Sequence, residues 1–274
     1  SQPIHPIQHV VGRTLITMPP SSHLKAFKAI WGEACHGMWV ELLCIAMAES
    51  HVISNYAGIP ADTSINDMFH TPDLKGRING LTKEVLLERS PGYRHAIVTY
   101  RIIILSACFE AYFINFLEDY ISCGRKLFDP DTGQRTAEGN KLYGEVRKTR
   151  GLVERVRVFA QLTGSKIKRI EENAGYLADV YSMRNVLAHQ SGIVDQTASE
   201  SLKHVSFPVG ERIILRPNEL IDLAAPDIKI AEILDTKIVS EYDPTIGATR
   251  PEVMAENRRR NPPKARPSRR QTAP

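Results

Sequence analysis

A long apolar segment in the first half of the chain limits the possible folds more than any other stretch. It reads AIVTYRIIILSACFEAYFINFLEDYI over residues 96–121, and as a helix it carries apolar side chains on several sides. Such a helix is typical of the centre of a bundle. Arg101 and Glu110 interrupt it, so no uncharged run approaches the roughly 20 residues that a membrane span needs. The segment predicts a buried central helix from about Tyr93 to Ser122, and no membrane contact.

Shorter helical patterns surround this segment and predict an all-α fold. Helices are predicted over residues 23–50, 138–162, 165–189 and 226–242. Ser165 is expected to cap the start of the third, and Gly192 to end it. The stretch HVSFPVGERIILRP has β-forming runs on both sides of a Pro-Val-Gly turn, which predicts a hairpin. The expected architecture is an all-α helical bundle with a small β-hairpin before the last helix.

Composition divides the chain into an arm, one domain and a tail. Residues 1–22 are Pro-rich and unpatterned, which predicts an extended N-terminal arm. Residues 23–250 form the predicted helical domain, with turn-forming residues marking an irregular insertion around 54–82. Residues 251–274 are rich in Pro and Arg and carry a net charge of +5, whereas the other 250 residues sum to −1. A tail of this composition cannot bury a core and is predicted to be disordered.

The tail therefore holds the whole positive excess of the chain. Positive charge favours the phosphate backbone of nucleic acids, so the basic residues of the tail are candidate RNA-binding residues. They are Arg258, Arg259, Arg260, Lys264, Arg266, Arg269 and Arg270. The alternative is that the tail only keeps the protein soluble.

The cysteines and the first residues bear on the cellular compartment. Cys35, Cys44, Cys108 and Cys123 form no Cys-x-x-Cys pair and lie in mostly apolar contexts, which predicts buried free thiols in a reducing cytosol. No histidine is spaced around them as a zinc ligand would be, so neither a metal nor a cofactor is expected. No charged leader precedes an apolar core, and the protein is expected to be cytoplasmic.

The stretch YSMRNVLAHQSGIVD, Tyr181 to Asp195, holds the candidate catalytic residues. Histidine titrates near neutral pH and moves protons, and arginine presents a charged planar fork to phosphate oxygens. RNA supplies its own nucleophile, the 2′-OH. A protein can therefore cleave RNA without a metal if it accepts that proton and stabilises the crowded phosphate. Arg184 and His189 are the candidates for these two tasks.

Helical spacing separates these two residues. Asn185 and His189 are four residues apart and share a face, whereas Arg184 and His189 diverge by about 140° on a regular helix. Either the helix loosens near His189 or other groups complete the site, and a second subunit is the simplest source. The bare pattern is not specific. With 22 arginines and nine histidines, chance gives the two matches found, of which Arg89 to His95 straddles an expected helix start.

The context of the first match is more specific than its spacing. RNVLAHQSGIVD resembles the motif of the HEPN superfamily of helical nucleases and nucleotide-binding modules, which lies on a late helix of the bundle. SACFEAYFINFLEDYI and VGERIILRPNELIDL resemble the early helix and the entry to the final helix in the HEPN group linked to RNA-targeting toxin and defence proteins. The resemblance covers roughly residues 93–243, and the region before residue 90 resembles no family.

The resemblance implies a metal-independent endoribonuclease with Arg184, Asn185 and His189 in its site. Two copies of the motif would meet in a homodimer, and the products would carry a 2′,3′-cyclic phosphate and a 5′-OH. Glu110 stands where many members keep an acidic residue that would support Arg184 or His189. Its other interpretation is a buried carboxylate paired with Arg101. RNA as the partner, a toxin or anti-phage role, and an inhibitor or sensor protein also follow from the resemblance.

A non-catalytic interpretation remains beside this one. Arg184 and Asn185 could cap or pair at a helix end, and His189 would favour the negative end of the helix dipole. The protein would then be a HEPN module that binds a nucleotide or a protein partner as a sensor or scaffold. Fold alone does not choose between the two interpretations.

Overall fold

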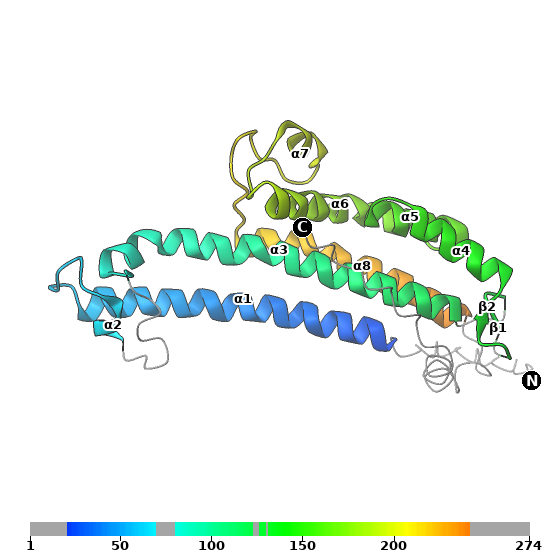
Figure 1. Cartoon of the computed structure of the whole chain (residues 1–274), viewed down its shortest axis with the longest axis horizontal. Coiled ribbons are helices and arrows are strands. Elements are labelled where there is room, and N and C mark those ends of the chain that lie inside the picture. Colours follow the sequence, from blue (N-terminus) through cyan, green and yellow to red (C-terminus); the bar gives the residue numbers. More distant parts are fainter. Residues whose placement is uncertain (1–20, 70–79, 123–125, 130, 242–274) are drawn as a thin grey trace, which may run out of the picture.

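The 40-residue helix α3 (Lys83–Ser122) is the axis of the molecule (Figure 1). This computed structural model describes residues 21–69, 80–122, 126–129 and 131–241, without the side chains of 238–241. α3 packs against α1 (Ser22–Asn55), α6 (Ile167–His189) and α8 (Pro217–Glu241). Its aromatic side chains fill the main core, among them the fully buried Phe109, Phe113 and Phe116. The predicted central helix is confirmed, and it begins ten residues earlier than Tyr93.

Pro91 lies inside α3 rather than near its start. A proline within a helix removes one backbone hydrogen bond and usually bends or ends the helix. The hydroxyl of Ser90 donates to the carbonyl of Leu86 at 2.6 Å. Leu86 also packs against a small cluster that contains Val52 and Met68. This tertiary packing keeps the first turns of α3 helical in spite of Pro91.

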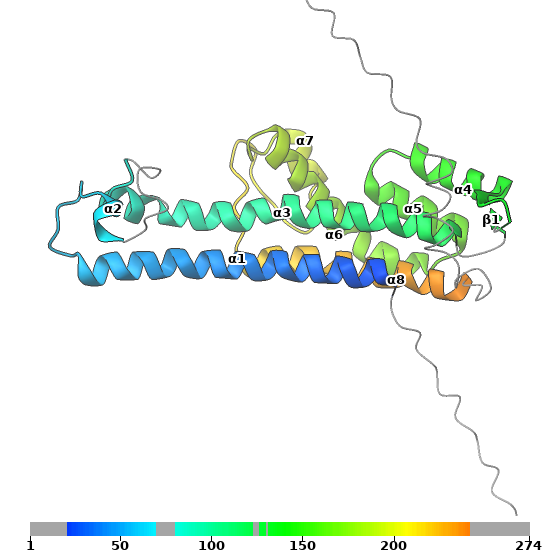
Figure 2. The same ribbon diagram turned by 60° about the horizontal axis from the view of Figure 1, so that its bottom comes forward.

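The remaining helices lie on two sides of α3 (Figures 1 and 2). α1 runs along one side as the first arm of a long helical hairpin. α4 (Ala137–Lys148), α5 (Leu152–Thr163) and α6 form the layer on the other side, and α8 lies beside α3 between the two layers. The short helix α7 (Gln196–Ser201) follows the end of α6. The predicted all-α fold is confirmed.

Three predicted helix boundaries are wrong. The helix expected over 138–162 is two helices, because Gly151 adopts a φ of +78° between α4 and α5. The N-cap of α6 is Lys166 without a side-chain cap, whereas the hydroxyl of Ser165 lies 2.7 Å from that of Thr163. The last helix begins at Pro217, not at residue 226. A proline suits the first helical turn, and Glu219 accepts the Arg216 N–H there at 2.8 Å.

The small β-hairpin exists, but at a different place from the one predicted. β1 (Phe128–Asp129) pairs antiparallel with β2 (Gln134–Arg135), ahead of α4. Residues 204–216 form no hairpin of their own but contain a turn, in which the Glu211 N–H donates to the carbonyl of Pro208. The segment after this turn pairs with residues 192–194 at the end of α6 instead of with its own first half. Its buried side chains, Ile213 and Leu215, join the core there, which explains the β-like pattern.

The predicted arm, insertion and tail are only partly described. Within the insertion, α2 (Ile65–Met68) and a bridge between Ser64 and Thr82 are regular, and α1 extends to Asn55. Residues 1–20, 70–79 and 242–274 lie outside the described residues, and with them lie the seven basic residues of the tail.

α1 is apolar on many sides but buries only one of them. Leu43 is 58% exposed and Met47 63% exposed. By length and mean hydropathy alone, α1 and α3 are each compatible with a membrane span, a test that a buried core helix also passes. The expectation of no membrane contact stays a prediction. The exposed Cys44 corrects the expectation of buried thiols, whereas Cys35 and Cys108 are half-buried.

Candidate functional site

The predicted catalytic residues lie in the last turns of α6. The helix stays regular through His189, and the N–H groups of Gln190 and Gly192 both donate to the carbonyl of Val186. Gly192 has a φ of +81°, which favours glycine, so the prediction that it ends this helix holds. Because the backbone stays regular up to His189, a loosened helix does not bring Arg184 and His189 together. Completion of the site by other groups is the remaining option.

Arg184 and Asn185 contact each other, whereas His189 stands apart. The Arg184 guanidinium donates to the Asn185 side-chain carbonyl at 3.1 Å. Arg184 is half-buried, and Asn185 and His189 are exposed. Between the described residues there is no hydrogen bond from Arg184 to His189. Within one chain, the His189 imidazole and the Arg184 guanidinium therefore diverge by about 140° around the helix.

Glu110 and Arg184 both act electrostatically on Tyr181. The Tyr181 hydroxyl donates to the carbonyl of Ser106 on α3 at 2.9 Å. Burial raises the pKa of Tyr181, the Glu110 carboxylate raises it further, and the positive charge of Arg184 lowers it. Arg101, the alternative partner of Glu110, instead forms an ion pair with Glu41 on α1. The supporting role predicted for Glu110 remains a prediction, since no direct contact with Arg184 or His189 is found within the described part of the chain.

A buried carboxylate that the sequence did not single out stands near the same tyrosine. Asp227 on α8 is fully buried, and neither of its carboxylate oxygens has a hydrogen-bond partner within the described residues. Burial raises the pKa of Asp227 well above its ordinary value, and its charge contributes to the raised pKa of Tyr181. Asp227 follows Pro226, which made it look like a helix start and concealed its place in the middle of α8.

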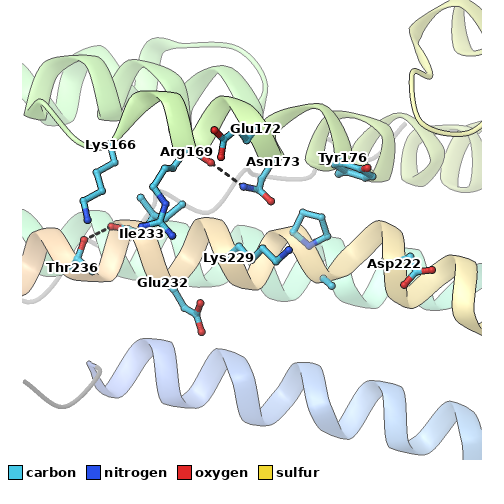
Figure 3. A pocket seen from close by; sticks show the side chains of 12 residues that line it. Lys166, Arg169, Glu172, Asn173, Tyr176, Asp222, Lys229, Glu232, Ile233 and Thr236 are labelled. Carbon is cyan, nitrogen blue, oxygen red and sulfur yellow. Dashed lines mark hydrogen bonds between the residues drawn. The ribbon is translucent and has the colours of Figure 1, made fainter. Parts of the chain in front are cut away.

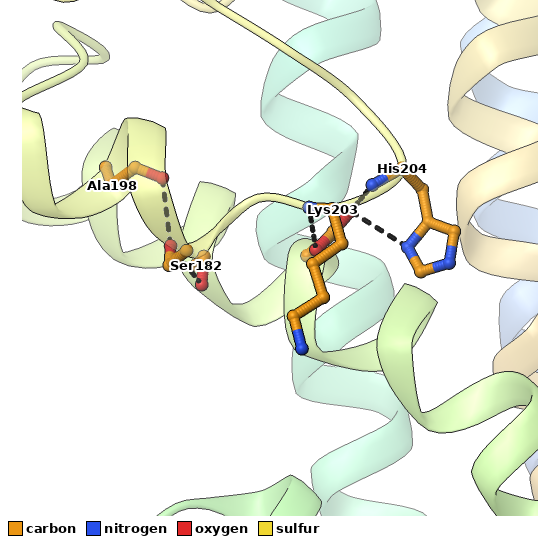
Figure 4. A network of polar contacts seen from close by, with 6 residues as sticks. Ser182, Ala198, Lys203 and His204 are labelled. Carbon is orange, nitrogen blue, oxygen red and sulfur yellow. Dashed lines mark hydrogen bonds and ion pairs between the residues drawn. The ribbon is translucent and has the colours of Figure 1, made fainter.

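A second group of residues that the sequence analysis missed lies earlier on α6. The buried Asp179 accepts hydrogen bonds from the backbone N–H groups of Lys203 and His204, and its carboxylate lies 3.2 Å from His204 Nδ1 (Figure 4). The His204 ring stacks on Tyr176 with ring centroids 3.7 Å apart. Gly175 makes this close approach possible, because a Cβ there would lie 2.5 Å from His204 Cε1. Asp179 thus fixes the imidazole by its Nδ1 edge.

The stacked Tyr176 forms one end of a cavity between α6 and α8 (Figure 3). The cavity has a volume of about 800 Å³. Lys166, Arg169 and Lys229 bring positive charge to it, Glu172 and Glu232 bring negative charge, and Asp222 lies at the Tyr176 end. Its lining includes neither Arg184 nor His189, so it is separate from the predicted catalytic residues.

The two places on α6 offer different chemistry. Arg184, Asn185 and His189 offer proton transfer and phosphate binding on an open surface. The cavity offers a pocket with charged and aromatic walls. No three His, Cys, Asp or Glu side chains of the described ranges gather closely enough to hold a metal ion. Comparison with models of known protein families, with characterised proteins and with solved structures gave no significant match.

Proposed function

We propose that this protein is an endoribonuclease whose active site is completed by a second copy of the chain. The observation that carries the proposal is the placement of Arg184, Asn185 and His189 at the accessible end of α6, with Arg184 joined to Asn185 and opposite to His189 on the helix. A two-fold axis beside this end of α6 would place the histidine of one subunit near the arginine of the other, because such an interface presents the same patch twice. The HEPN resemblance supports the same arrangement.

The reaction needs no group beyond those of the two motifs. One histidine accepts the 2′-OH proton while the 2′-oxygen forms a bond to phosphorus. The bond from phosphorus to the 5′-oxygen breaks, and the second histidine donates a proton to that oxygen. The two arginines stabilise the charge that builds on the non-bridging oxygens. The products are a 2′,3′-cyclic phosphate and a 5′-OH. A toxin or anti-phage role is proposed on the resemblance alone.

The test is cleavage of total RNA by the purified full chain in EDTA, followed by analysis of the cut ends. His189→Ala should lower the cleavage rate by about 10²- to 10⁴-fold, the range that a positioned acid or base contributes. His36→Ala is the matched control, since His36 is an exposed histidine on α1, the layer on the other side of α3. Full activity of a folded His189→Ala protein would end the catalytic proposal.

The second candidate is a non-catalytic module that binds a protein partner or a nucleotide. The specific observation in its favour is the exposed apolar side of α1, which includes Leu43 and Met47. Exposed apolar surface of this kind is typical of interaction sites. Intact RNA after incubation with wild-type protein, together with capture of a partner that Met47→Glu abolishes, would favour this candidate.

A further inference from the structure

We propose that the cavity between α6 and α8 binds a phosphorylated small molecule, with its phosphate at Lys166 and Arg169 and a planar ring at Tyr176. This site is distinct from the nuclease proposal, since the cavity lining excludes Arg184 and His189. Four features of the cavity support it: its charge, the helix end that it meets, its length and its fixed aromatic wall.

Three cations and three carboxylates line the cavity. Lys166 and Arg169 lie at one end, beside Thr236, with Lys229 near the middle (Figure 3). Within the described residues, none of these three cations forms an ion pair. Of the three lining carboxylates, Glu172 lies beside Arg169, Glu232 is paired with Lys28 on α1 at 2.5 Å, and Asp222 lies at the opposite end beside Tyr176. An unpaired cluster of two or three cations in a cavity is the ordinary recognition chemistry for phosphate.

The same end of the cavity meets the amino terminus of α6. Lys166 is the N-cap, it makes no side-chain cap hydrogen bond, and no acidic residue occurs in the first turn. Helix starts favour negative groups, because the free N–H groups and the helix dipole are positive there. This first turn carries Lys168 and Arg169 instead. Positive side chains at a positive helix end repel each other unless an anion joins them, which is the arrangement of an anion site.

The spacing along α6 sets the length of the ligand. Arg169 and Tyr176 are seven residues, or two turns, apart and share a face, which places them about 10 Å apart along the helix axis. An inorganic phosphate at Arg169 therefore does not reach Tyr176. A phosphate ester that carries an unsaturated ring fits both, and Asp222 beside Tyr176 can accept an N–H or O–H of that ring.

The aromatic wall is held in place before any ligand arrives. Asp179 fixes His204, and His204 stacks on Tyr176 with an angle of 26° between the ring planes. A fixed ring loses little side-chain freedom on binding, which favours stacking of a planar ligand group. This arrangement gives His204 a positioning role, since it acts on the ligand through Tyr176.

The experiment is calorimetric titration of the full chain with three probes: inorganic pyrophosphate, a purine nucleoside diphosphate and the unphosphorylated nucleoside. The diphosphate should bind most tightly, and the nucleoside should not bind measurably. Arg169→Gln should weaken the diphosphate at least about 10-fold, the loss expected for one charge-assisted phosphate contact. Lys168→Gln is the matched control, because Lys168 has the same charge in the same turn but does not line the cavity.

The aromatic contact is tested with two variants of one residue. Tyr176→Leu should weaken the diphosphate by about 5- to 100-fold, as loss of a stacking platform does, and leave pyrophosphate unchanged. Tyr176→Phe should bind both probes as the wild type does. No binding of any phosphate probe, or equal losses in Lys168→Gln and Arg169→Gln, would overturn the proposal.

Two further measurements distinguish the small-ligand site from an RNA-binding site and from the nuclease proposal. A single-stranded RNA oligonucleotide that loses more affinity than the diphosphate in Arg169→Gln would assign the cavity to RNA and overturn the small-ligand site. RNA cleavage by Arg169→Gln should equal that of the wild type. Loss of diphosphate binding with intact cleavage, or the reverse, therefore distinguishes failure of the cavity proposal from failure of the nuclease proposal.

Discussion

The two ends of α6 differ in the kind of candidate site they carry and in whether the sequence reveals that site. The carboxyl-terminal end carries Arg184, Asn185 and His189, which a reader of the sequence notices at once, yet they lie on an open surface and diverge. The amino-terminal half carries no motif, yet Arg169 and Tyr176 border a cavity of about 800 Å³. A motif indicates which chemistry the side chains can perform, whereas a cavity shows where a ligand can be enclosed. In this chain the two do not coincide, unless a second copy encloses the motif.

The largest expected effect concerns the carboxyl-terminal end. Arg184→Ala and His189→Ala should each lower RNA cleavage by about 10²- to 10⁴-fold. When the two variants are mixed, the shared site of a hybrid dimer keeps one intact arginine and one intact histidine. Partial recovery of activity would show that one copy of each suffices, and an inactive mixture would show that the site needs every copy of both. The measurement is the cleavage rate of the mixture against that of each variant alone.

One outcome would refute the shared-site proposal. It is a wild-type chain that cleaves RNA fully at concentrations where sizing shows only monomer. Arg184→Lys should also be poor, since lysine lacks the planar fork that contacts two phosphate oxygens.

The next largest effect concerns RNA affinity, and we expect it from the basic tail rather than from α6. Deletion of residues 251–274 removes seven basic residues and the whole positive excess of the chain. We expect weaker RNA binding and a flatter dependence of the binding constant on salt, by about 0.7 in the logarithmic slope for each lost contact to single-stranded RNA. The cleavage rate at saturating RNA should not change. An unchanged salt slope would show that the tail does not contact RNA.

A smaller effect, on the free energy of unfolding, is expected from Asp227 in the middle of α8. Because burial raises its pKa, the folded chain holds this proton over a pH range in which the unfolded chain has lost it. The free energy of unfolding should therefore fall as pH rises from about 4 through the raised pKa. Asp227→Asn should remove this slope and stabilise the fold at neutral pH by on the order of 2 kcal/mol.

The measurement for Asp227 is urea unfolding at several pH values. Asp222→Asn is the control, since Asp222 is an exposed aspartate one and a half turns earlier on α8. If the free energy of unfolding depends on pH equally in the wild type and in Asp227→Asn, the pH dependence does not come from Asp227.

The smallest effect compares two helical glycines. Gly144→Ala in α4 meets open space and should stabilise the fold by about 0.5–1 kcal/mol, as alanine does within a helix. Gly175→Ala should lose that gain or destabilise, since its Cβ would come within 2.5 Å of the His204 ring. Thermal unfolding of both variants measures the difference. Equal stabilisation would show that His204 is not held against α6.

The fold was more predictable from the sequence than the site. α3 and the all-α class follow from apolar periodicity over many residues, and such a signal survives local exceptions such as Pro91. The break at Gly151 and the start of α8 depend on one or two residues, and patterns of charge and apolarity do not fix those. The hairpin predicted over residues 204–217 was wrong, because burial against the end of α6 produces the same alternation of buried and exposed side chains as a hairpin.

The cavity could not be predicted because its two walls are far apart in the sequence. Arg169 and Tyr176 on α6 look like an ordinary solvated helix face, and so do Asp222 and Lys229 on α8. Only the packing of α6 on α8 brings the four residues to one cavity. The Asp179–His204 contact joins a helix to a loop and has no spacing rule either. A buried aspartate within an apolar helix was the one available signal.

The far end of the α1–α3 hairpin has its own small apolar cluster, built on Val52, Ile65 and Met68 and separate from the two larger ones. Few side chains hold this tip together, and its contacts are local in sequence. It can therefore unfold without disturbing the rest of the bundle, as a cooperative unit of low stability. Backbone amides of α2 should exchange with deuterated solvent through such local opening, while those in the middle of α3 wait for global unfolding.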